Sequence, residues 1–427
     1  MSPYCPSQSG SRFSAESGRM SEEREKTAAA SPMRGDEDTL PKLLLRNYRM
    51  WGKRRIALRK KRHGIWNIYT WADCYQNVEE IFYGLQVIGL GSDDKVAILG
   101  DNGVVWFWSQ LAIQSAGGRV IGLNPALSAA ALKPYLEVSR PKLVLARDQE
   151  QVDKLLEIEK DIPYVQKILY WDEKGLRHYQ NPRLLSLSEA IKKGHDGRGT
   201  RPGTLEEHIS RTKADATALI MYRSEKEGTP EEVPATHRFL ISAAETIIAQ
   251  NPVGSNHEYV SLVYPGWLFE QVLGYCISLI TGQRLNFAEG VETAFSDFRE
   301  ISPHSMTYPA HLWESLAAAI EMNMARSSKM EQALFRRCLS LNKKLHEGGT
   351  ARKLSIREGI LALVLEFILL RCLRDKHGLN RIRVAYSAGG SPKKETVEFL
   401  QALGVNLKVI KGFVDSGITL SEPNGAG

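Results

Sequence analysis

The sequence predicts an α/β fold in which parallel sheets are covered by helices on both faces. Short apolar runs alternate with longer amphipathic segments along most of the chain, and this alternation is typical of βαβ units with buried parallel strands. Hydrophobic residues make up 43% of the chain and charged residues 25%, as in ordinary globular domains. The longest apolar stretch, residues 360–370, is interrupted by Glu366 and falls well short of the roughly 20 residues that a membrane-spanning helix needs.

The first predicted element is a helix over residues 40–51, where Leu43, Leu44, Tyr48 and Trp51 recur at helical spacing. Further helices are predicted over residues 70–88, 105–116 and 149–160. Glycine pairs at 89 and 91 and at 117 and 118 end the first two of these. The predicted strands of this half are residues 66–70, 95–100, 119–122, 142–146 and 167–170.

The same alternation continues in the second half of the chain, after a polar, glycine-rich connection at residues 194–202. This connection predicts two similar subdomains, residues 39–200 and 201–427, which meet near residue 200. A partly inserted helical segment is expected at about residues 327–379. The predicted strands of the second half are residues 216–222, 259–263, 284–287, 305–307 and 383–387.

Residues 1–38 are rich in Ser, Gly and Glu and contain no apolar run, which predicts a disordered leader without a signal peptide. The cysteines are five in number, widely spaced and without a CxxC pair. This pattern favours neither a disulfide framework nor a structural zinc site. A reducing, cytoplasmic location is therefore expected.

The net charge is +7 and the sequence pI is about 9.0, with a basic cluster at residues 53–62. Such a cluster could contact nucleic acid or an anionic lipid surface. A solvated hairpin is the alternative, because Ile56, Ala57 and Leu58 form a short apolar run between the charges. No nucleic-acid-binding motif accompanies the cluster, so the sequence favours the hairpin and no nucleic-acid partner.

Four segments resemble the AMP-forming long-chain acyl-CoA synthetases. They are residues 64–73 with 91–102, residues 264–271 (YPGWLFEQ), residues 385–392 (AYSAGGSP), and residues 404–408 leading into 411–417 (KGFVDSG). The resemblance implies the N-terminal domain of such an enzyme, which binds ATP with Mg²⁺ and a long-chain fatty acid to form an acyl-adenylate. In complete members a C-terminal lid domain follows and CoA then completes the reaction. This sequence ends at Gly427, before the segments of that lid, so a C-terminally truncated member is expected.

The resemblance places the phosphate loop of the family at residues 222–232 (YRSEKEGTPEE), where Ser224, Gly228 and Pro230 match. The lysine of the family is Glu231 here. Two basic and four acidic residues give this stretch a net charge of −2, whereas a phosphate loop normally relies on small residues and a lysine. One like-charge contact costs about 1 kcal/mol in water and about 4 kcal/mol at an effective dielectric near 20. Weakened ATP binding is therefore expected.

The other site residues are also carried over from the resemblance. Gly389 and Gly390 correspond to the adenine-side loop, and Gly412 belongs to the second nucleotide segment. Asp415 takes the place of the glutamate that binds magnesium, while Val414 and Lys411 replace a threonine and an aromatic residue. Trp267 is expected either beside the fatty-acid tunnel or in the core. His237, in the THR triplet that follows the phosphate loop, is expected to be structural.

The sequence therefore leaves three hypotheses open. In the first, the chain is an acyl-binding or regulatory pseudoenzyme that holds a long-chain fatty acid or pairs with an intact synthetase. In the second, it is an active fatty-acid-activating enzyme with a remodelled loop. In the third, it is a gene fragment without a role. Residues 356–373, apolar and flanked by arginines, could lie peripherally on the inner membrane surface or pack against the core.

Overall fold

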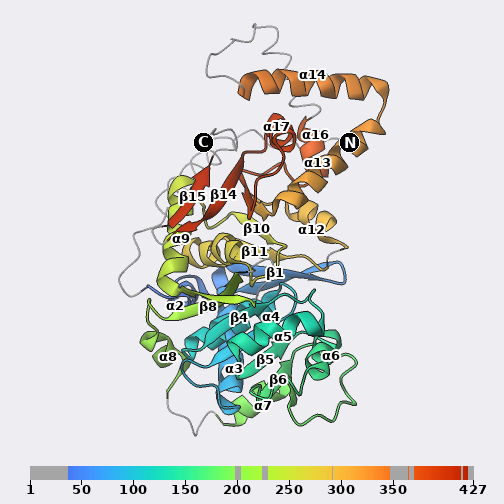
Figure 1. Ribbon diagram of the computed structural model, residues 1–427. Coiled ribbons are helices and arrows are strands. Elements are labelled where there is room, and N and C mark those ends of the chain that lie inside the picture. The colour runs from blue at the N-terminus through green and yellow to red at the C-terminus, as the bar shows by residue number, and fades with distance from the viewer. Residues whose placement is uncertain are drawn as a thin grey trace, which may run out of the picture.

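The computed structural model describes residues 37–197, 203–223, 229–290, 292–346, 364, 370–414 and 417–421. These residues form two mostly parallel sheets with helices on their faces, and the predicted α/β class is confirmed. In Figure 1 the sheet at the bottom is built mainly from the blue-to-green part of the chain and the sheet above it mainly from the yellow-to-red part.

The seven-stranded sheet has the order β7-β6-β5-β3-β4-β8-β9. Its strands are β3 (Lys95–Leu99), β4 (Arg119–Leu123), β5 (Leu143–Ala146), β6 (Lys167–Tyr170), β7 (Leu184–Ser186), β8 (Thr217–Arg223) and β9 (Glu231–Thr236). All neighbours run parallel except β9, which returns antiparallel along β8. Every residue of β5 is buried, as expected of a parallel strand covered on both faces.

The eight-stranded sheet has the order β15-β14-β13-β12-β10-β11-β1-β2. Its strands are β1 (Ile56–Arg62), β2 (Ile65–Thr70), β10 (Glu258–Ser261), β11 (Arg284–Phe287), β12 (Ser305–Tyr308), β13 (Val384–Ala388), β14 (Leu407–Val414) and β15 (Gly417–Ser421). The pairs β1–β2 and β14–β15 are antiparallel and the other neighbours are parallel.

Most predicted helices are found close to their expected bounds. The helix α3 begins at a capping box, in which Thr70 Oγ1 accepts the Asp73 N–H (3.2 Å) and Asp73 Oδ2 accepts the Thr70 N–H (2.7 Å). The helices are α2 (Leu40–Trp51), α3 (Trp71–Val87), α4 (Val104–Ser115), α5 (Ala129–Ser139), α6 (Gln149–Glu157), α7 (Leu187–Asp196), α8 (Leu205–Arg211), α9 (His237–Gln250), α10 (Leu268–Glu270), the π-helix η3 (Gln271–Cys276), α11 (Ile277–Thr281), α12 (Ala294–Ile301), α13 (Ala310–Ala325), α14 (Lys329–His346), α16 (Arg371–Lys376) and α17 (Lys394–Ala402), with a short 3₁₀ turn η1 (Gly52–Arg54).

The predicted boundary near residue 200 does not separate the two sheets. Strands β1 and β2, early in the chain, belong to the eight-stranded sheet, whereas β8 and β9, beyond residue 200, belong to the seven-stranded one. The reason is the parallel pairing of β1 with β11, which aligns Leu58 with Leu285. A pairing between such distant segments leaves no signal in local periodicity.

The basic cluster at residues 53–62 forms a β-hairpin with β2, as predicted. The expectation that this hairpin is solvated is wrong for the strand β1. Because β1 lies between β2 and β11, Lys61 is only 6% exposed. Its Nζ forms ion pairs with Asp297 (2.8 Å) and Glu300 (2.6 Å). Arg59 pairs with the buried Glu258 at 3.2 Å. Part of the basic cluster therefore forms ion pairs inside the fold.

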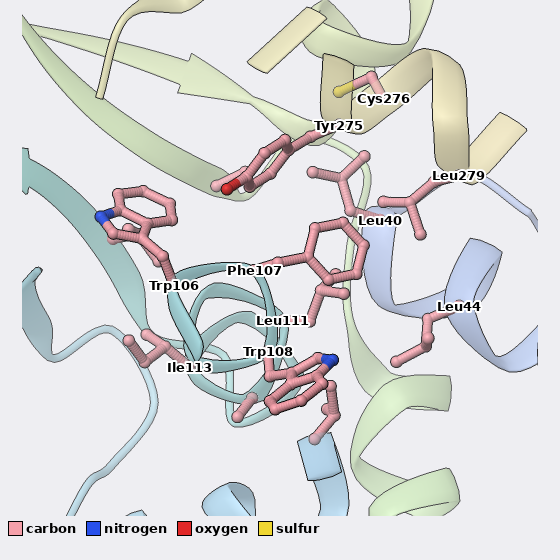
Figure 2. Packing of buried hydrophobic residues seen from close by; sticks show 14 of the residues in the cluster. Leu40, Leu44, Trp106, Phe107, Trp108, Leu111, Ile113, Tyr275, Cys276 and Leu279 are labelled. Carbon is pink, nitrogen blue, oxygen red and sulfur yellow. The ribbon is translucent and has the colours of Figure 1, made fainter. Parts of the chain in front are cut away.

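The helix α4 is the centre of the main core, and all but one of its residues are buried. Figure 2 shows Phe107 pointing between Leu40 of α2 and Tyr275 of η3, with Trp106 and Trp108 on either side of it. The rings of Phe107 and Tyr275 lie 5.1 Å apart in an edge-to-face arrangement. A helix that is apolar on all sides is expected to be buried on all sides, and α4 links helices that belong to both sheets.

The predicted helical segment at residues 327–379 is represented by α14 and α16, and α14 extends across the top of Figure 1. Of residues 356–373, the structure describes only Val364 and residues 370–373, so the choice between membrane surface and core lies largely outside the described residues. Residues 1–36 of the expected leader lie outside them too. Within the described ranges, no helix combines the length and apolar character needed to span a bilayer.

Candidate functional site

The carboxyl ends of strands from both sheets meet at Asn102, which follows β3. Its Nδ2 donates to Ser261 Oγ (2.5 Å), at the end of β10, and to the Val263 carbonyl (2.7 Å). Ligands of open α/β sheets bind in crevices outside the carboxyl ends of the strands. This junction is therefore the candidate site, and sequence reasoning did not single out Asn102.

Two glycines bring the backbones of the sheets together at this junction. A Cβ atom on Gly122, in β4, would lie 2.3 Å from the Cα of Gly266. Only the absence of both side chains permits so close an approach. Gly266 belongs to the segment 264–271 singled out by its resemblance, and it immediately precedes Trp267. The contact therefore fixes where this tryptophan lies.

Trp267 and the glycine loop after β13 lie in contact. A Cβ on Gly389 would lie 3.5 Å from Trp267 Cζ2, and Gly389 has a φ of +74° that favours glycine. The buried Ser387 holds the loop by donating from Oγ to the Gly390 carbonyl (2.8 Å). Trp267 is half-buried beside Phe269, with ring centroids 4.8 Å apart. The structure thus brings together the expected acyl-side residue and the expected adenine-side loop, whose roles stay predictions.

The stretch predicted as a phosphate loop, residues 222–232, includes the end of β8 and the start of β9. Arg223 pairs with Glu231 across the hairpin, and Arg223 Nη1 lies 3.4 Å from Glu231 Oε2 in an exposed ion pair. Pro230 is buried at the start of β9, whereas Ser224 and Gly228 lie outside the described residues. At the position where the resemblance predicts the lysine of the family, the carboxylate of Glu231 is thus paired with its hairpin neighbour.

A second ion pair holds the next carboxylate of the hairpin. Lys95 Nζ, from β3, donates to both carboxylate oxygens of Glu232 at 2.8 Å. Both side chains are about a quarter exposed, so water screens this pair less than the pair at Glu231. Sequence reasoning did not pair Lys95, in the segment 91–102, with Glu232, because the two residues lie 137 positions apart.

The base of the hairpin is anchored by Tyr222. Its hydroxyl bonds to Ser139 of α5 and donates to the Tyr135 carbonyl (3.3 Å). The rings of Tyr135 and Tyr222 meet edge to face at 4.7 Å. Burial raises the pKa of the Tyr222 hydroxyl, so the group is a neutral structural contact at physiological pH. The hairpin therefore leaves the sheet from a fixed point.

The second nucleotide segment begins on β14, next to the glycine loop. Ala388 pairs with Ile410, so Gly412 lies on the same carboxyl edge as Gly389. Asp415, the expected magnesium ligand, lies outside the described residues. In the part of the chain that the structure describes, no group of three or more His, Cys, Asp or Glu side chains is placed to hold a metal ion.

His237 is structural, as expected. It is 3% exposed, and its Nδ1 accepts the Leu40 N–H at 3.3 Å. Burial lowers the pKa of the imidazole to about 3, so the ring stays neutral. It joins α9 to the start of α2 rather than facing the strand ends.

A buried carboxyl group lies directly behind the junction of the sheets. Glu270 is fully buried, accepts from the Tyr259 hydroxyl (2.9 Å) and bonds to Ser261. Burial raises the pKa of Glu270 to about 7. Ser261 also binds Asn102, so one network links the carboxyl to the candidate site. Glu270 lies in the segment 264–271 that carries the resemblance, but nothing in the sequence predicted it to be a buried acid.

We expect Glu270 to make the stability of the protein depend on pH near neutrality. The folded state keeps the proton to a higher pH than the unfolded state, so stability is greatest below the usual pKa of 4.5 and is lost as the pH rises through about 7. Between pH 6 and 8 this loss amounts to about 1.4 kcal/mol. Urea unfolding at pH 6, 7 and 8 should show a weaker pH dependence for Glu270→Gln. The exposed Glu321→Gln serves as the control, and identical dependences in all three proteins would contradict this assignment.

Two surface cavities are lined by other parts of the chain. One of about 460 Å³ is formed by residues 172–178, and one of about 630 Å³ lies between α2, α3 and the start of α8. Neither is lined by residues from the candidate site.

Comparisons with known protein families and sequences agree on one family. The family described as AMP-binding enzyme matches residues 46–413. The long-chain-fatty-acid–CoA ligase ACSBG2 of Xenopus laevis is 22% identical over 382 residues, which cover 86% of this chain and 50% of that protein. The chloroplastic long-chain-fatty-acid–[acyl-carrier-protein] ligase AEE15 of Arabidopsis thaliana is 23% identical over 408 residues, covering 86% of this chain and 54% of that protein. The chain thus spans about half the length of these curated relatives.

Solved structures share the fold. The anthranilate CoA ligase AuaEII, in complex with anthranoyl-AMP, matches with a TM-score of 0.64 at 14% identity, over 87% of this chain and 59% of that one. The adenylation domain of a carboxylate reductase from Mycobacterium chelonae matches with a TM-score of 0.64 at 17% identity, over 95% of this chain and 64% of that one. At these identities the likeness establishes the fold, which is that of the N-terminal domain of adenylate-forming enzymes.

Proposed function

The chain belongs to the AMP-binding enzyme family, and from that premise we propose that it keeps the acyl side of the family's site while its acidic hairpin weakens ATP binding. Enzymes of the family use ATP, typically with Mg²⁺, and the relatives named above are ligases of long-chain fatty acids. The proposed role is that of a fatty-acid-binding homologue with impaired adenylate formation.

The observation that carries the proposal is the pairing of Glu231. A triphosphate needs cations and small donors at the loop, but the residue in the lysine position is an acid that binds Arg223. Lys95, the other described cation of the hairpin, is bound by Glu232. The described residues of the hairpin therefore do not fit an ATP–Mg²⁺ complex, since each cation would first have to leave its carboxylate.

The acyl side is supported by the contact of Trp267 with the glycine loop. Leu268 and Phe269 follow it, all three are half-buried, and Phe269 packs on the indole. Partly buried apolar and aromatic side chains at a strand-end crevice are the usual lining of an apolar ligand site. The proposed ligand is a long-chain fatty acid, in line with the substrates named for the relatives.

A second candidate function is that of an active acyl-activating enzyme with a remodelled loop. It is favoured by the presence of two cations, Arg223 and Lys95, at the hairpin. If Glu231 and Glu232 turned to solvent or shared a cation, both cations could face a phosphate. ATP–pyrophosphate exchange that depends on palmitate would establish this second function and refute the first.

The proposal is tested by calorimetry of the full chain with MgATP and with palmitate. We expect palmitate to bind and MgATP to give no heat of binding at concentrations up to about 1 mM, the range in which functional enzymes bind their substrates. Palmitate should also change the tryptophan fluorescence, and Trp267→Phe should remove this change while Trp66→Phe, on the distant strand β2, retains it. Tight MgATP binding, or a palmitate response independent of Trp267, would contradict the proposal.

A further inference from the structure

A row of basic side chains crosses the amino ends of four neighbouring strands, at the edge opposite the candidate site. Main-chain hydrogen bonds between neighbouring strands hold these residues side by side. The Arg284 N–H donates to the His257 carbonyl (3.0 Å). The His304 N–H donates to the Glu258 carbonyl (2.9 Å), and the Arg383 N–H donates to the His304 carbonyl (2.8 Å). These residues begin or precede β11, β10, β12 and β13, which run parallel. The row is therefore a fixed feature of the sheet edge.

The two histidines of the row are stacked and neutral. Their ring centroids lie 4.7 Å apart and the rings are 8° from parallel. His304 Nδ1 accepts the Glu258 N–H (3.0 Å), and His257 Nδ1 accepts the Gly254 N–H (3.2 Å). Because a backbone N–H can only donate, each neutral ring carries its proton on Nε2. Burial and the neighbouring arginines lower the pKa of His257 to about 4 and that of His304 to about 3.

Arg381 extends this stack. Its Nη2 lies 3.3 Å from His304 Nδ1 and 3.0 Å from His304 Nε2. Nearly equal distances to both ring nitrogens mean that the guanidinium lies over the ring face rather than in line with a lone pair, as arginine does on aromatic rings. Among the described residues, the other hydrogen bond of its guanidinium is a 3.4 Å contact of Nη1 with the Ile301 carbonyl, so N–H groups remain for another acceptor.

The charges of the row are only partly balanced. Glu258 is buried and pairs with Arg284 (2.8 Å) and with Arg59 of β1 (3.2 Å). Arg383 is exposed, and its guanidinium has no ion pair or hydrogen bond within the described ranges. Arg381 and Arg383 lie two residues apart just before β13, and neither forms an ion pair among the described residues, so a negatively charged acceptor would offset the positive charge that they concentrate there.

We propose that Arg381 and Arg383, on the platform of the stacked His257 and His304, form a binding site for a phosphate group. Two guanidinium groups offer the paired N–H donors that match phosphate oxygens, and the imidazole Nε2–H groups add donors without adding charge. The site lies at the amino edge of the strands, away from the junction at Asn102. It does not depend on adenylate formation or on the acyl site.

The test uses inorganic phosphate as the probe, with the full chain at constant ionic strength in chloride. We expect saturable shifts of the ring-proton NMR signals of His257 and His304 and a matching heat of binding. The double variant Arg381→Gln/Arg383→Gln should weaken phosphate binding about tenfold or more, because each lost charge-assisted hydrogen bond removes that order of affinity. The exposed Arg211→Gln on α8 removes a positive charge away from this site and serves as the control, which should bind as the original chain does.

A second arm distinguishes a free phosphate from a lipid headgroup. Vesicles of phosphatidylcholine with and without phosphatidic acid are sedimented with the chain, and binding that requires phosphatidic acid, Arg381 and Arg383 would assign the phosphate group to a membrane lipid. Binding of inorganic phosphate without vesicle binding would assign it to a soluble ligand. Arg383→Lys, which keeps the charge, should fold normally and bind with intermediate strength. No response in either arm, or equal losses in the Arg211→Gln control, would overturn the proposal.

Discussion

Restoring the family's phosphate loop is expected to raise the affinity for MgATP by at least about a hundredfold. The variant combines Glu225→Gly, Lys226→Thr, Glu227→Thr and Glu231→Lys. Residues 222–232 then carry two basic and one acidic residue in place of two basic and four acidic ones, so their net charge changes from −2 to +1. Removing several like-charge contacts of about 1 kcal/mol or more each accounts for the expected gain.

The single change that matters most in this set is Glu231→Lys. It removes the carboxylate that binds Arg223 (3.4 Å), so that one substitution supplies a lysine and also frees an arginine. The measurement is calorimetry with MgATP before and after the four changes. A control with the same increase in charge, Glu292→Gln with Glu321→Lys, alters exposed positions elsewhere and should leave the affinity unchanged. If the restored loop gains nothing, binding is limited by the second segment, where Lys411 and Val414 replace an aromatic residue and a threonine.

Gly122→Ala is expected to lower the free energy of unfolding by about 3 kcal/mol. The new Cβ, attached to the main chain of β4, would lie 2.3 Å from Gly266 Cα, which is itself a main-chain atom. The steric clash can be relieved only if the strand β4 and the loop before Trp267 move apart, because no flexible side chain can yield. This is the upper end of the cost of overpacking in a well-packed interior.

Urea unfolding measures this loss, and Gly103→Ala is the matched control. A Cβ on Gly103 would meet no atom within 4 Å, and its φ of 173° is extended backbone that any residue adopts. We expect the control to change stability by less than about 1 kcal/mol. Because Gly266 precedes Trp267, Gly122→Ala should also change the tryptophan fluorescence of the folded protein. Equal stabilities for the two variants would show that the sheets separate more easily at this point than the packing indicates.

Local pattern predicted most of the secondary structure. The helix over residues 40–51 and the strands over residues 167–170 and 284–287 lie where periodicity and composition placed them. Each is decided by neighbours in the chain: apolar spacing, a capping residue, or a short run bounded by turn residues. The order of the motifs also identified the family, and the match over residues 46–413 confirmed it.

Strand pairing set the limit of these predictions. The sequence placed a solvated hairpin at residues 53–62, but β1 pairs with β11 and buries Lys61 between Asp297 and Glu300. Likewise, the net charge of residues 222–232 does not include Lys95, which is distant in the sequence. In the structure Lys95 reaches Glu232 from β3. A register between distant strands is set by the packing of whole faces, which local periodicity does not encode.

The sequence by itself determined the α/β class, the family and the acidic character of the hairpin that follows β8. Only the tertiary structure decided that Glu231 and Glu232 are each bound to a cation, that Trp267 lies on the Gly389 loop, and that His257 and His304 stack beneath Arg381. The physical reason is that composition and periodicity act between residues a few positions apart. Contacts between strand ends depend instead on which strands become neighbours, and this is settled by burial over the whole domain.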